Sequence, residues 1–381
     1  MRDVIEAVAN WIQQGETFAL ATVVSTSKSA PRPAGASMAV GSGGEAVGSV
    51  SGGCVEGTVY QLGQEVIEDG FPVLERFGYS DDDAFAVGLT CGGIIDVFVE
   101  RVNREIFPEI DRVISDINNG VPVATATLVE HPQPERIGQR LVVWPEQTSG
   151  TLGSHQLDHA VVDDAVGLLA AGESKVLMYG PDGERMETGA KIFVASYQPK
   201  PRMIIFGAID FAAAVARAGS MIGFEVTVCD AREVFATAAR FPAADAVVVS
   251  WPHTYLEQEL AKGRVDNRTV ICVLTHDPKF DVPVLDIALR LEGSAKPAYI
   301  GVMGSRKTHH DRMVRLQDAG LGEEQMGQMR SPIGLDLGGR TPEETAISVA
   351  AEIIAERWGG TGEPLRKLVG AVHPHTTQPL Q

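Results

Sequence analysis

Cysteine is scarce in this sequence, and no two cysteines have the close spacing of a zinc knuckle or a redox C-x-x-C motif. A structural disulfide is not expected in a reducing compartment, so each cysteine is interpreted from its neighbours. The four are Cys54, Cys91, Cys229 and Cys272.

Long apolar runs are also missing. No uninterrupted run approaches the roughly 18 residues of a membrane span, and the nearest candidate, residues 204–216, contains Asp210. Asp3 and Glu6 interrupt the apolar core that a secretory signal at the N-terminus would need. The first fifteen residues instead predict an amphipathic helix, and we expect a cytoplasmic protein without a membrane span.

Basic residues are too few to balance the acidic ones. The chain has 32 Lys and Arg against 50 Asp and Glu, a formal net charge of −18. Such a surface repels nucleic acids and anionic membranes, so neither is an expected partner. A local basic pocket for one phosphorylated ligand remains compatible with this charge.

The length of 381 residues predicts two or three domains. Residues 1–196 alternate short strands and helices, which indicates a mixed α+β domain with a core of about 1–120 plus extra strands. The segment YQPKPR, 197–202, is the best linker candidate. Residues 203–358 alternate continuous apolar strands with helices, the pattern of a Rossmann-like parallel sheet, so the fold class is α/β. Residues 359–381 are expected to form a flexible tail.

The last helix of the second domain has a clear predicted start. Thr341 is a suitable N-cap, Pro342 suits the first turn, and Glu344 completes a capping box. The double glycine 359–360 ends the helical pattern.

The most informative motif of the first half is GSVSGGCVEG, residues 48–57, where a strand meets a predicted helix. Gly52 and Gly53 allow a close backbone approach, and the free N–H groups at a helix start favour an anion. Cys54 in this field is a candidate nucleophile or soft-metal ligand. The alternative is a small buried cysteine in a tight turn.

A second cysteine is flanked by glycines in GLTCGG, residues 88–93. Cys91 and Gly92 lie just before a predicted strand, and the two cysteine motifs can converge on one ligand. Cys229 and Cys272 lie within apolar strands and are interpreted as core residues.

The first parallel strand of the second domain is followed by half of a dinucleotide-binding fingerprint. Gly207 matches the first glycine of G-x-G-x-x-G, but Ile209 and Ala212 replace the other two. Asp230 has the separation expected of a ribose-binding acid. Ile209 argues against ordinary NAD(P) binding, and a Rossmann scaffold without a dinucleotide is an equal alternative.

The segment YIGVMGSRK, residues 299–307, offers groups suited to a phosphate. These are the backbone and side chains of Gly301, Gly304, Ser305, Arg306 and Lys307. The alternative is a glycine turn before a solvated basic helix start.

These motifs together resemble the XdhC/CoxI family of molybdoenzyme accessory proteins. The N-terminal block consists of PAGASMAV, GGCVEG and GLTCGG; the C-terminal block consists of DAR from Asp230, LTHDPKFD, YIGVMGSRK and SPIGLDLGGRTPEE. The resemblance implies a protein that binds molybdenum cofactor, supports its sulfuration and delivers it to an apo-molybdoenzyme of the xanthine dehydrogenase or carbon monoxide dehydrogenase type. It implies a maturation factor rather than a free-standing enzyme.

Site residues follow from the resemblance by position. Cys54 and Cys91 become candidates for contact with molybdenum or for sulfur relay, which agrees with the soft character of thiolates. The implied cofactor-binding set is Gly52, Gly53, Cys54, Glu56, Cys91 and Gly92. The residue patterns of the Rossmann-like domain, and not the resemblance, give a second candidate set for a phosphate or nucleotide: Gly207, Asp230, Arg232, Gly301, Gly304, Ser305, Arg306 and Lys307.

One loop departs from the family pattern. The family usually has G-A-G-H where this chain has residues 207–210, G-A-I-D, so no family role is carried over to this loop. Two alternatives stay open: an NAD(P)-dependent oxidoreductase, which Ile209 disfavours but Asp230 keeps open, and a cysteine sulfur transferase in which Cys54 carries a persulfide. The expected partners are the apo-enzyme, a cysteine desulfurase and, from the frequency of two-fold oligomers, a second copy of the chain.

Overall fold

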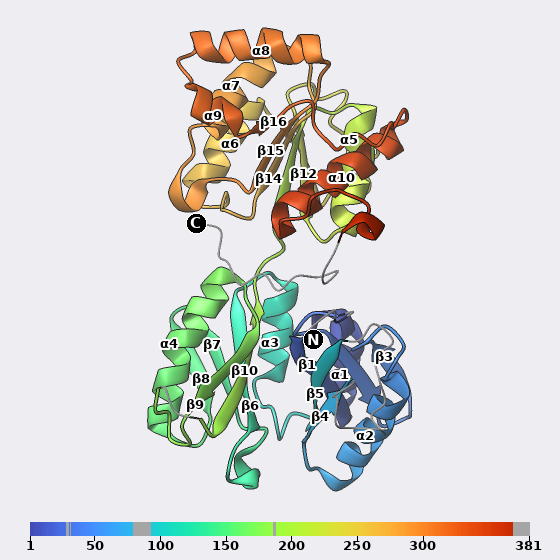
Figure 1. Ribbon diagram of the computed structural model, residues 1–381, viewed down its shortest axis with the longest axis vertical. Helices are drawn as coiled ribbons and strands as arrows, with labels where there is room; N and C mark the ends of the chain where they lie inside the picture. Colours follow the sequence, from blue (N-terminus) through green and yellow to red (C-terminus); the bar gives the residue numbers. More distant parts are fainter. Residues whose placement is uncertain (28–29, 31, 79–92, 186–187, 369–381) are drawn as a thin grey trace. The chain divides into compact units, whose positions relative to one another are not determined.

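The structure is a computed structural model that describes residues 1–27, 30, 32–78, 93–185 and 188–368. The chain forms two compact units, the first ending at Pro199 and the second running from Lys200 to Leu368. The first unit contains two antiparallel sheets and the second a parallel sheet (Figure 1).

The first sheet of unit 1 has the strand order β3-β2-β1-β5-β4, with antiparallel pairing throughout. Its strands alternate apolar residues between two faces, as the two-residue period of a strand requires. One face packs on α2, and the other on α1 and the second sheet. The elements are η1 (Arg2–Val4), α1 (Ile5–Gln14), β1 (Phe18–Ser27), β2 (Ser37–Gly41), β3 (Ala46–Gly48), α2 (Glu56–Asp69), β4 (Val73–Phe77) and β5 (Ile94–Val102).

The second sheet of unit 1 has the order β8-β7-β6-β10-β9 and is also antiparallel. One face packs on α4, and the other shares a core with the first sheet, α1 and α3. Unit 1 is therefore two sheets stacked face to face, with α2 and α4 on the outer faces. The elements are α3 (Ile110–Asn118), β6 (Val123–Glu130), η2 (Pro134–Arg136), β7 (Arg140–Trp144), β8 (Gln147–Thr151), α4 (His155–Ala171), β9 (Lys175–Tyr179) and β10 (Ala190–Tyr197).

Unit 2 is a six-stranded parallel sheet in the order β13-β12-β11-β14-β15-β16, the doubly wound order of a Rossmann fold. Helices α5 and α10 cover one face, and α6 to α9 cover the other (Figure 1). The strands are β11 (Arg202–Phe206), β12 (Glu225–Asp230), β13 (Ala246–Val249), β14 (Val270–Val273), β15 (Tyr299–Val302) and β16 (Met329–Arg330). The helices are α5 (Asp210–Met221), α6 (Pro252–Ala261), α7 (Pro278–Ala288), η3 (Gly293–Ala295), α8 (Arg306–Asp318), α9 (Glu323–Gly327), α10 (Pro342–Trp358) and η4 (Leu365–Lys367).

The predicted fold class is confirmed, with a mixed first unit and a Rossmann-like second unit. The predicted cap of α10 is present: the Glu344 amide donates to Thr341 Oγ1, and the Glu344 carboxylate accepts from the Thr341 amide. The strand-rich stretch after residue 121 forms a second sheet stacked on the first. Of the predicted tail, residues 369–381 lie outside the described residues.

Candidate functional site

The turn between β3 and α2 is built around one carboxylate. Gly52 and Gly53 have φ values of +80° and +117°, a region that favours glycine. Among the described residues, a Cβ at either position would meet nothing within 4 Å, and both glycines are exposed. These glycines serve the backbone conformation rather than close packing.

The Glu56 carboxylate fills the inside of this turn. It accepts hydrogen bonds from four backbone amides and two hydroxyls, all within seven residues of it. The donors are Ser49 Oγ (2.6 Å), the Val50 amide (3.2 Å), the Ser51 amide (2.9 Å), Ser51 Oγ (2.6 Å), the Gly53 amide (2.9 Å) and the Val55 amide (3.2 Å).

These contacts keep Glu56 ionised. Burial by itself raises the pKa of this carboxyl, but the hydrogen bonds from Ser49 and Ser51 outweigh it and lower the pKa of Glu56 to about 2. The sequence predicted that Gly52 and Gly53 offer their amides to an external phosphate or oxo group. In the structure the Gly53 amide donates to the Glu56 carboxylate, and the Gly52 amide donates to Ser49 Oγ. The anion bound by this turn is therefore a carboxylate of the chain itself.

Cys54 sits at the end of this turn, just before α2. Its amide donates to Ser51 Oγ at 2.9 Å, and its side chain is half-buried against the apolar cluster under α2. The same cluster contains Phe77 and Ile95, which pair across β4 and β5 beside the two ends of segment 79–92. Cys91 and Gly92 belong to that segment and lie outside the described residues, so their predicted roles stay predictions.

The glycine turn of unit 2 follows β11 and is also closed by a carboxylate. Asp230, at the end of β12, accepts from the Ala208 amide at 2.7 Å and pairs with Arg232 through Nε and Nη2 at 2.9 and 2.7 Å. Burial by itself raises the pKa of Asp230, but its bonds to Arg232 and Ala208 outweigh it and lower the pKa. Asp230 is 2% exposed, so the predicted ribose-binding acid is engaged within the turn.

Gly207 is held tightly where it leaves the sheet. Its φ is +115°, and a Cβ there would lie 2.9 Å from Thr275 Cγ2 and 3.0 Å from the Thr275 amide nitrogen. The adjacent ends of β11 and β14, the switch point of the sheet, are therefore in direct contact. Asp210, in the first turn of α5, adds a negative charge where a dinucleotide fold binds pyrophosphate.

The start of α8 has the opposite charge. Ser305 caps the helix by accepting from the Thr308 amide at 3.1 Å, and Arg306 and Lys307 are exposed in a first turn without an acid. Gly304, with φ +155°, precedes them. Gly301 was grouped with these residues from the sequence, but it lies buried inside β15, where a Cβ would meet Ile333 at 2.5 Å. Gly301 therefore serves packing, not this loop.

A buried ion pair joins two of the C-terminal motifs, LTHDPKFD and YIGVMGSRK. Arg312 Nη2 donates to Asp281 at 3.0 Å and to the Met303 carbonyl at 3.0 Å, and Thr275 donates to Asp281. Burial raises the pKa of Asp281, against the opposing effect of Thr275 and Arg312. No local pattern singles out Arg312 in the sequence, since its partner is 31 residues away.

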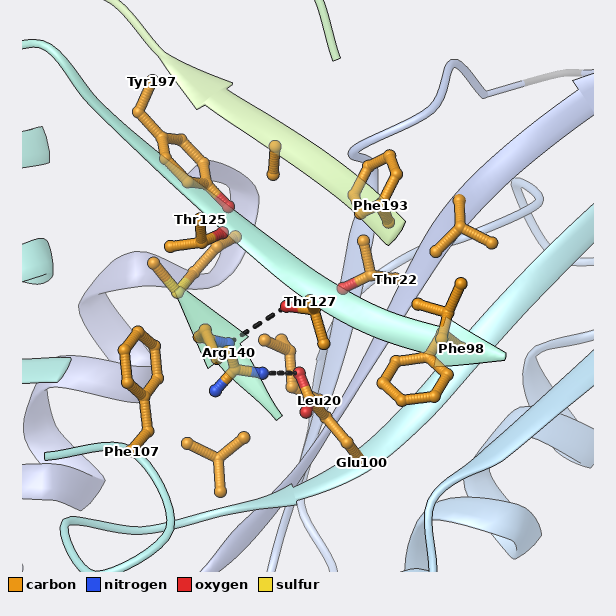
Figure 2. Close-up of a pocket in the computed structure, with 15 residues that line it drawn as sticks. Leu20, Thr22, Phe98, Glu100, Phe107, Thr125, Thr127, Arg140, Phe193 and Tyr197 are labelled. Carbon is orange, nitrogen blue, oxygen red and sulfur yellow. Dashed lines mark hydrogen bonds and ion pairs between the residues drawn. The ribbon is translucent and has the colours of Figure 1, made fainter. Parts of the chain in front are cut away.

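Between the two sheets of unit 1 lies a small cavity, shown in Figure 2. Glu100 from β5 and Arg140 from β7 form an ion pair across it, and Arg140 Nε also donates to Thr127 at 3.1 Å. The guanidinium carbon of Arg140 lies 4.2 Å from the centre of the Phe107 ring. The cavity volume is about 30 Å³, which is room for one or two water molecules and not for a pterin.

Comparison with known proteins gives the family. The XdhC Rossmann domain matches residues 203–353, and the XdhC and CoxI family matches residues 11–78 and 117–180. The chain belongs to the XdhC and CoxI family. Its two structural units correspond to these two matches.

Two relatives align over more than nine-tenths of the chain. A probable xanthine dehydrogenase subunit of Bacillus subtilis is 29% identical over 91% of this chain and 95% of its own length. The "Molybdenum cofactor insertion chaperone PaoD" of Escherichia coli is 26% identical over 93% of this chain and 88% of its own length.

A solved structure supports the fold of this XdhC family member. The crystal structure of a xanthine dehydrogenase from Bacillus halodurans superimposes with a TM-score of 0.69, covering 97% of this chain and 98% of that one, at 24% identity. None of the described helices combines the length and apolar composition that crossing a bilayer requires.

Proposed function

We propose that this protein carries molybdenum cofactor as cargo in the cytoplasm, supports its sulfuration and delivers it to a molybdoenzyme of the xanthine dehydrogenase class or a carbon monoxide dehydrogenase relative. Two findings support molybdenum cofactor as the cargo: the family match, and the similarity to the insertion chaperone of Escherichia coli, which aligns over 88% of that protein's length. The engaged Asp230 and the acidic start of α5 favour this role over that of an NAD(P)-dependent oxidoreductase.

The observation that carries the proposal is the placement of Cys54. Cys54 follows directly on a turn that Glu56 fixes through six hydrogen bonds, and its side chain is half-buried. A thiolate is a soft ligand that suits molybdenum and can carry a persulfide. We assign Glu56 the role of holding this turn, not of touching the cargo.

Sulfur relay through Cys54 has a simple chemical balance. A persulfide on a donor such as a cysteine desulfurase passes its terminal sulfur to the Cys54 thiolate, and the donor keeps its own sulfur as a thiolate. Cys54 then bears the persulfide, and this transfer needs no external oxidant or reductant. Whether Cys91 shares this role stays a prediction, as does phosphate binding by Ser305, Arg306 and Lys307.

The test is anaerobic incubation with purified molybdenum cofactor, followed by desalting and assay of retained pterin and molybdenum. We compare the wild type with Cys54→Ala and Cys91→Ala, and use Cys272→Ala as a matched control because Cys272 is a buried cysteine of unit 2. Retention by the wild type and the control, with loss in Cys54→Ala, supports the proposal.

Two results contradict it. If the wild type retains neither pterin nor molybdenum, the protein does not carry this cargo. If Cys54→Ala retains the cargo and restores an apo-molybdoenzyme to the same activity as the wild type, Cys54 neither contacts the molybdenum nor relays sulfur. Mass spectrometry of Cys54 after exposure to a persulfide donor separates these two roles.

A further inference from the structure

The hydroxyl of Ser51 joins the Glu56 carboxylate to the backbone of Cys54. Ser51 Oγ accepts hydrogen bonds from the Cys54 amide at 2.9 Å and from the Val55 amide at 3.0 Å. It also donates to the Glu56 carboxylate at 2.6 Å. Ser51 is 2% exposed, whereas Cys54 is half-buried, so this hydroxyl holds the chain from inside the turn.

The direction of each of these hydrogen bonds follows from the charge of Glu56. The pKa of Glu56 is lowered to about 2, so at neutral pH its carboxylate can only accept. The proton of the Ser51 hydroxyl therefore points to Glu56, and both lone pairs of Ser51 Oγ are left for the two backbone amides. A hydroxyl offers one donor and two acceptor positions, and all three are used here. The hydroxyl is thus held in one orientation.

The two residues between Ser51 and Cys54 are both glycines. Gly52 and Gly53 have φ values of +80° and +117°, and glycine has more conformational freedom than any other residue. A cysteine that follows two glycines needs a contact from outside the pair to keep one orientation. The hydrogen bond from the Cys54 amide to Ser51 Oγ is such a contact, because it spans the glycine pair.

Ser49 provides a comparison within the same turn. Its hydroxyl also donates to the Glu56 carboxylate at 2.6 Å, but it accepts from the Gly52 amide, at 2.9 Å. The two serines therefore make equivalent bonds to the carboxylate and differ in the amides that they hold. A contribution to the stability of the turn is common to both residues, whereas a contribution to the placement of Cys54 is specific to Ser51.

We propose that Ser51 is a positioning residue for sulfur transfer: its buried hydroxyl fixes the backbone of Cys54 across the glycine pair, so that the thiol meets a persulfide donor in one orientation. This inference rests on the proposed function, in which Cys54 receives the terminal sulfur of the donor. Ser51 acts through Cys54 and touches neither the donor nor the cargo.

Amide hydrogen exchange of the full chain, resolved by residue, tests the anchoring without any cargo. Ser51→Ala should speed exchange about three- to tenfold at Cys54, and less at Val55, whose amide also donates to Glu56. Ser49→Ala should instead speed exchange at Gly52. Unchanged exchange in the middle of α2 shows that both variants are folded. If Ser51→Ala leaves exchange at Cys54 at the wild-type rate, the anchoring is wrong.

The rate of sulfur transfer tests the positioning. The probe is a cysteine desulfurase in its persulfide form, and mass spectrometry follows the added sulfur on Cys54. Ser51→Ala should slow transfer at least about tenfold, and Ser49→Ala less than about threefold, because the reaction between two proteins requires a defined orientation of the thiol. Iodoacetamide approaches from any direction, so it should modify Cys54 in Ser51→Ala at least as fast as in the wild type.

The outcomes separate this inference from the proposed function. If the wild type accepts no sulfur on Cys54, the proposed sulfur relay fails, and the role of Ser51 fails with it. If the wild type accepts sulfur and Ser51→Ala does so at the same rate, only the positioning role fails. Equal slowing by Ser51→Ala and Ser49→Ala would also overturn that role, because it would show a general effect on the turn.

Discussion

The two glycine turns of this protein are both closed by a carboxylate of the chain itself, but the carboxylate comes from different places. In unit 1 the carboxylate of Glu56 accepts hydrogen bonds from donors one to seven residues before it, within the turn that it fixes. In unit 2 the carboxylate of Asp230 comes from the neighbouring strand, 22 residues from the Ala208 amide that it accepts from.

This difference decides what each turn can do. The turn held by Glu56 is fixed yet open, since a Cβ added at Gly52 or Gly53 would meet no described atom within 4 Å, and Cys54 beside them is half-buried. The turn held by Asp230 is closed, because Gly207 presses against Thr275 and the carboxylate is covered by Arg232. A glycine motif alone therefore does not identify a ligand site. It must also be known which group accepts hydrogen bonds from the backbone amides of the motif.

The largest expected contrast is between alanine substitutions in the two turns. Gly207→Ala adds a Cβ that clashes with the backbone of Thr275 at a strained φ, and should cost about 3–5 kcal/mol of stability. Gly52→Ala adds only left-handed strain and should cost about 1–2 kcal/mol. Urea unfolding followed by tryptophan fluorescence measures both; equal costs would mean that the second turn is as open as the first.

Cysteine reactivity sharpens the same contrast. Cys54 is half-buried, whereas Cys229 and Cys272 are fully buried, and burial raises the pKa of each of these two thiols to about 12. In the native protein, iodoacetamide should modify Cys54 at least about 100-fold faster than either of them. Peptide mass spectrometry over time gives the rates, and labelling in urea is the control that equalises them. Comparable native rates would contradict the placement of Cys54.

The smallest effect concerns the charge on Glu56. Glu56→Gln should cost about 1–3 kcal/mol at pH 7, because the amide replaces an ionised acceptor with one that also presents N–H donors to the turn. The pKa of Glu56 is lowered to about 2, so its contribution is complete above the ordinary pKa and is lost as the pH falls toward 2.

The stability difference between wild type and Glu56→Gln should therefore shrink as the pH is lowered from 5 to 3. Urea midpoints over this range measure it, with Glu65→Gln as the control, since Glu65 is exposed on the same helix α2. A difference that does not depend on pH would show that the charge of Glu56 does not hold the turn.

The sequence predicted well those features whose partners lie close together along the chain. The capping box of α10 involves residues three apart, and helix α2 begins within the motif GSVSGGCVEG, where the sequence predicted that a strand meets a helix. The parallel sheet of unit 2 follows from its repeated strand and helix pattern. Local hydrogen bonds and hydrophobic periodicity leave direct traces in the sequence, which makes these features predictable.

The sequence predicted less well how the polar groups are used. Glu56 was grouped with the cofactor-binding residues, yet it is the group that fills the turn. Gly301 was expected in a phosphate loop, yet it packs inside β15. In both cases the residue type was informative, but the role of the residue depends on which groups the fold places next to it.

By itself, the sequence determined the family, the two-unit organisation, the parallel sheet and the caps, because each depends on residues near one another or on a repeating pattern. Only the tertiary structure decided that Asp230, at the end of β12, closes the turn after β11. The same holds for the ion pair of Arg312 with Asp281 and for that of Glu100 with Arg140 between the two sheets of unit 1. These pairs span 22 to 40 residues. Their formation depends on strand register and on how the layers stack, and no single segment of the sequence determines either.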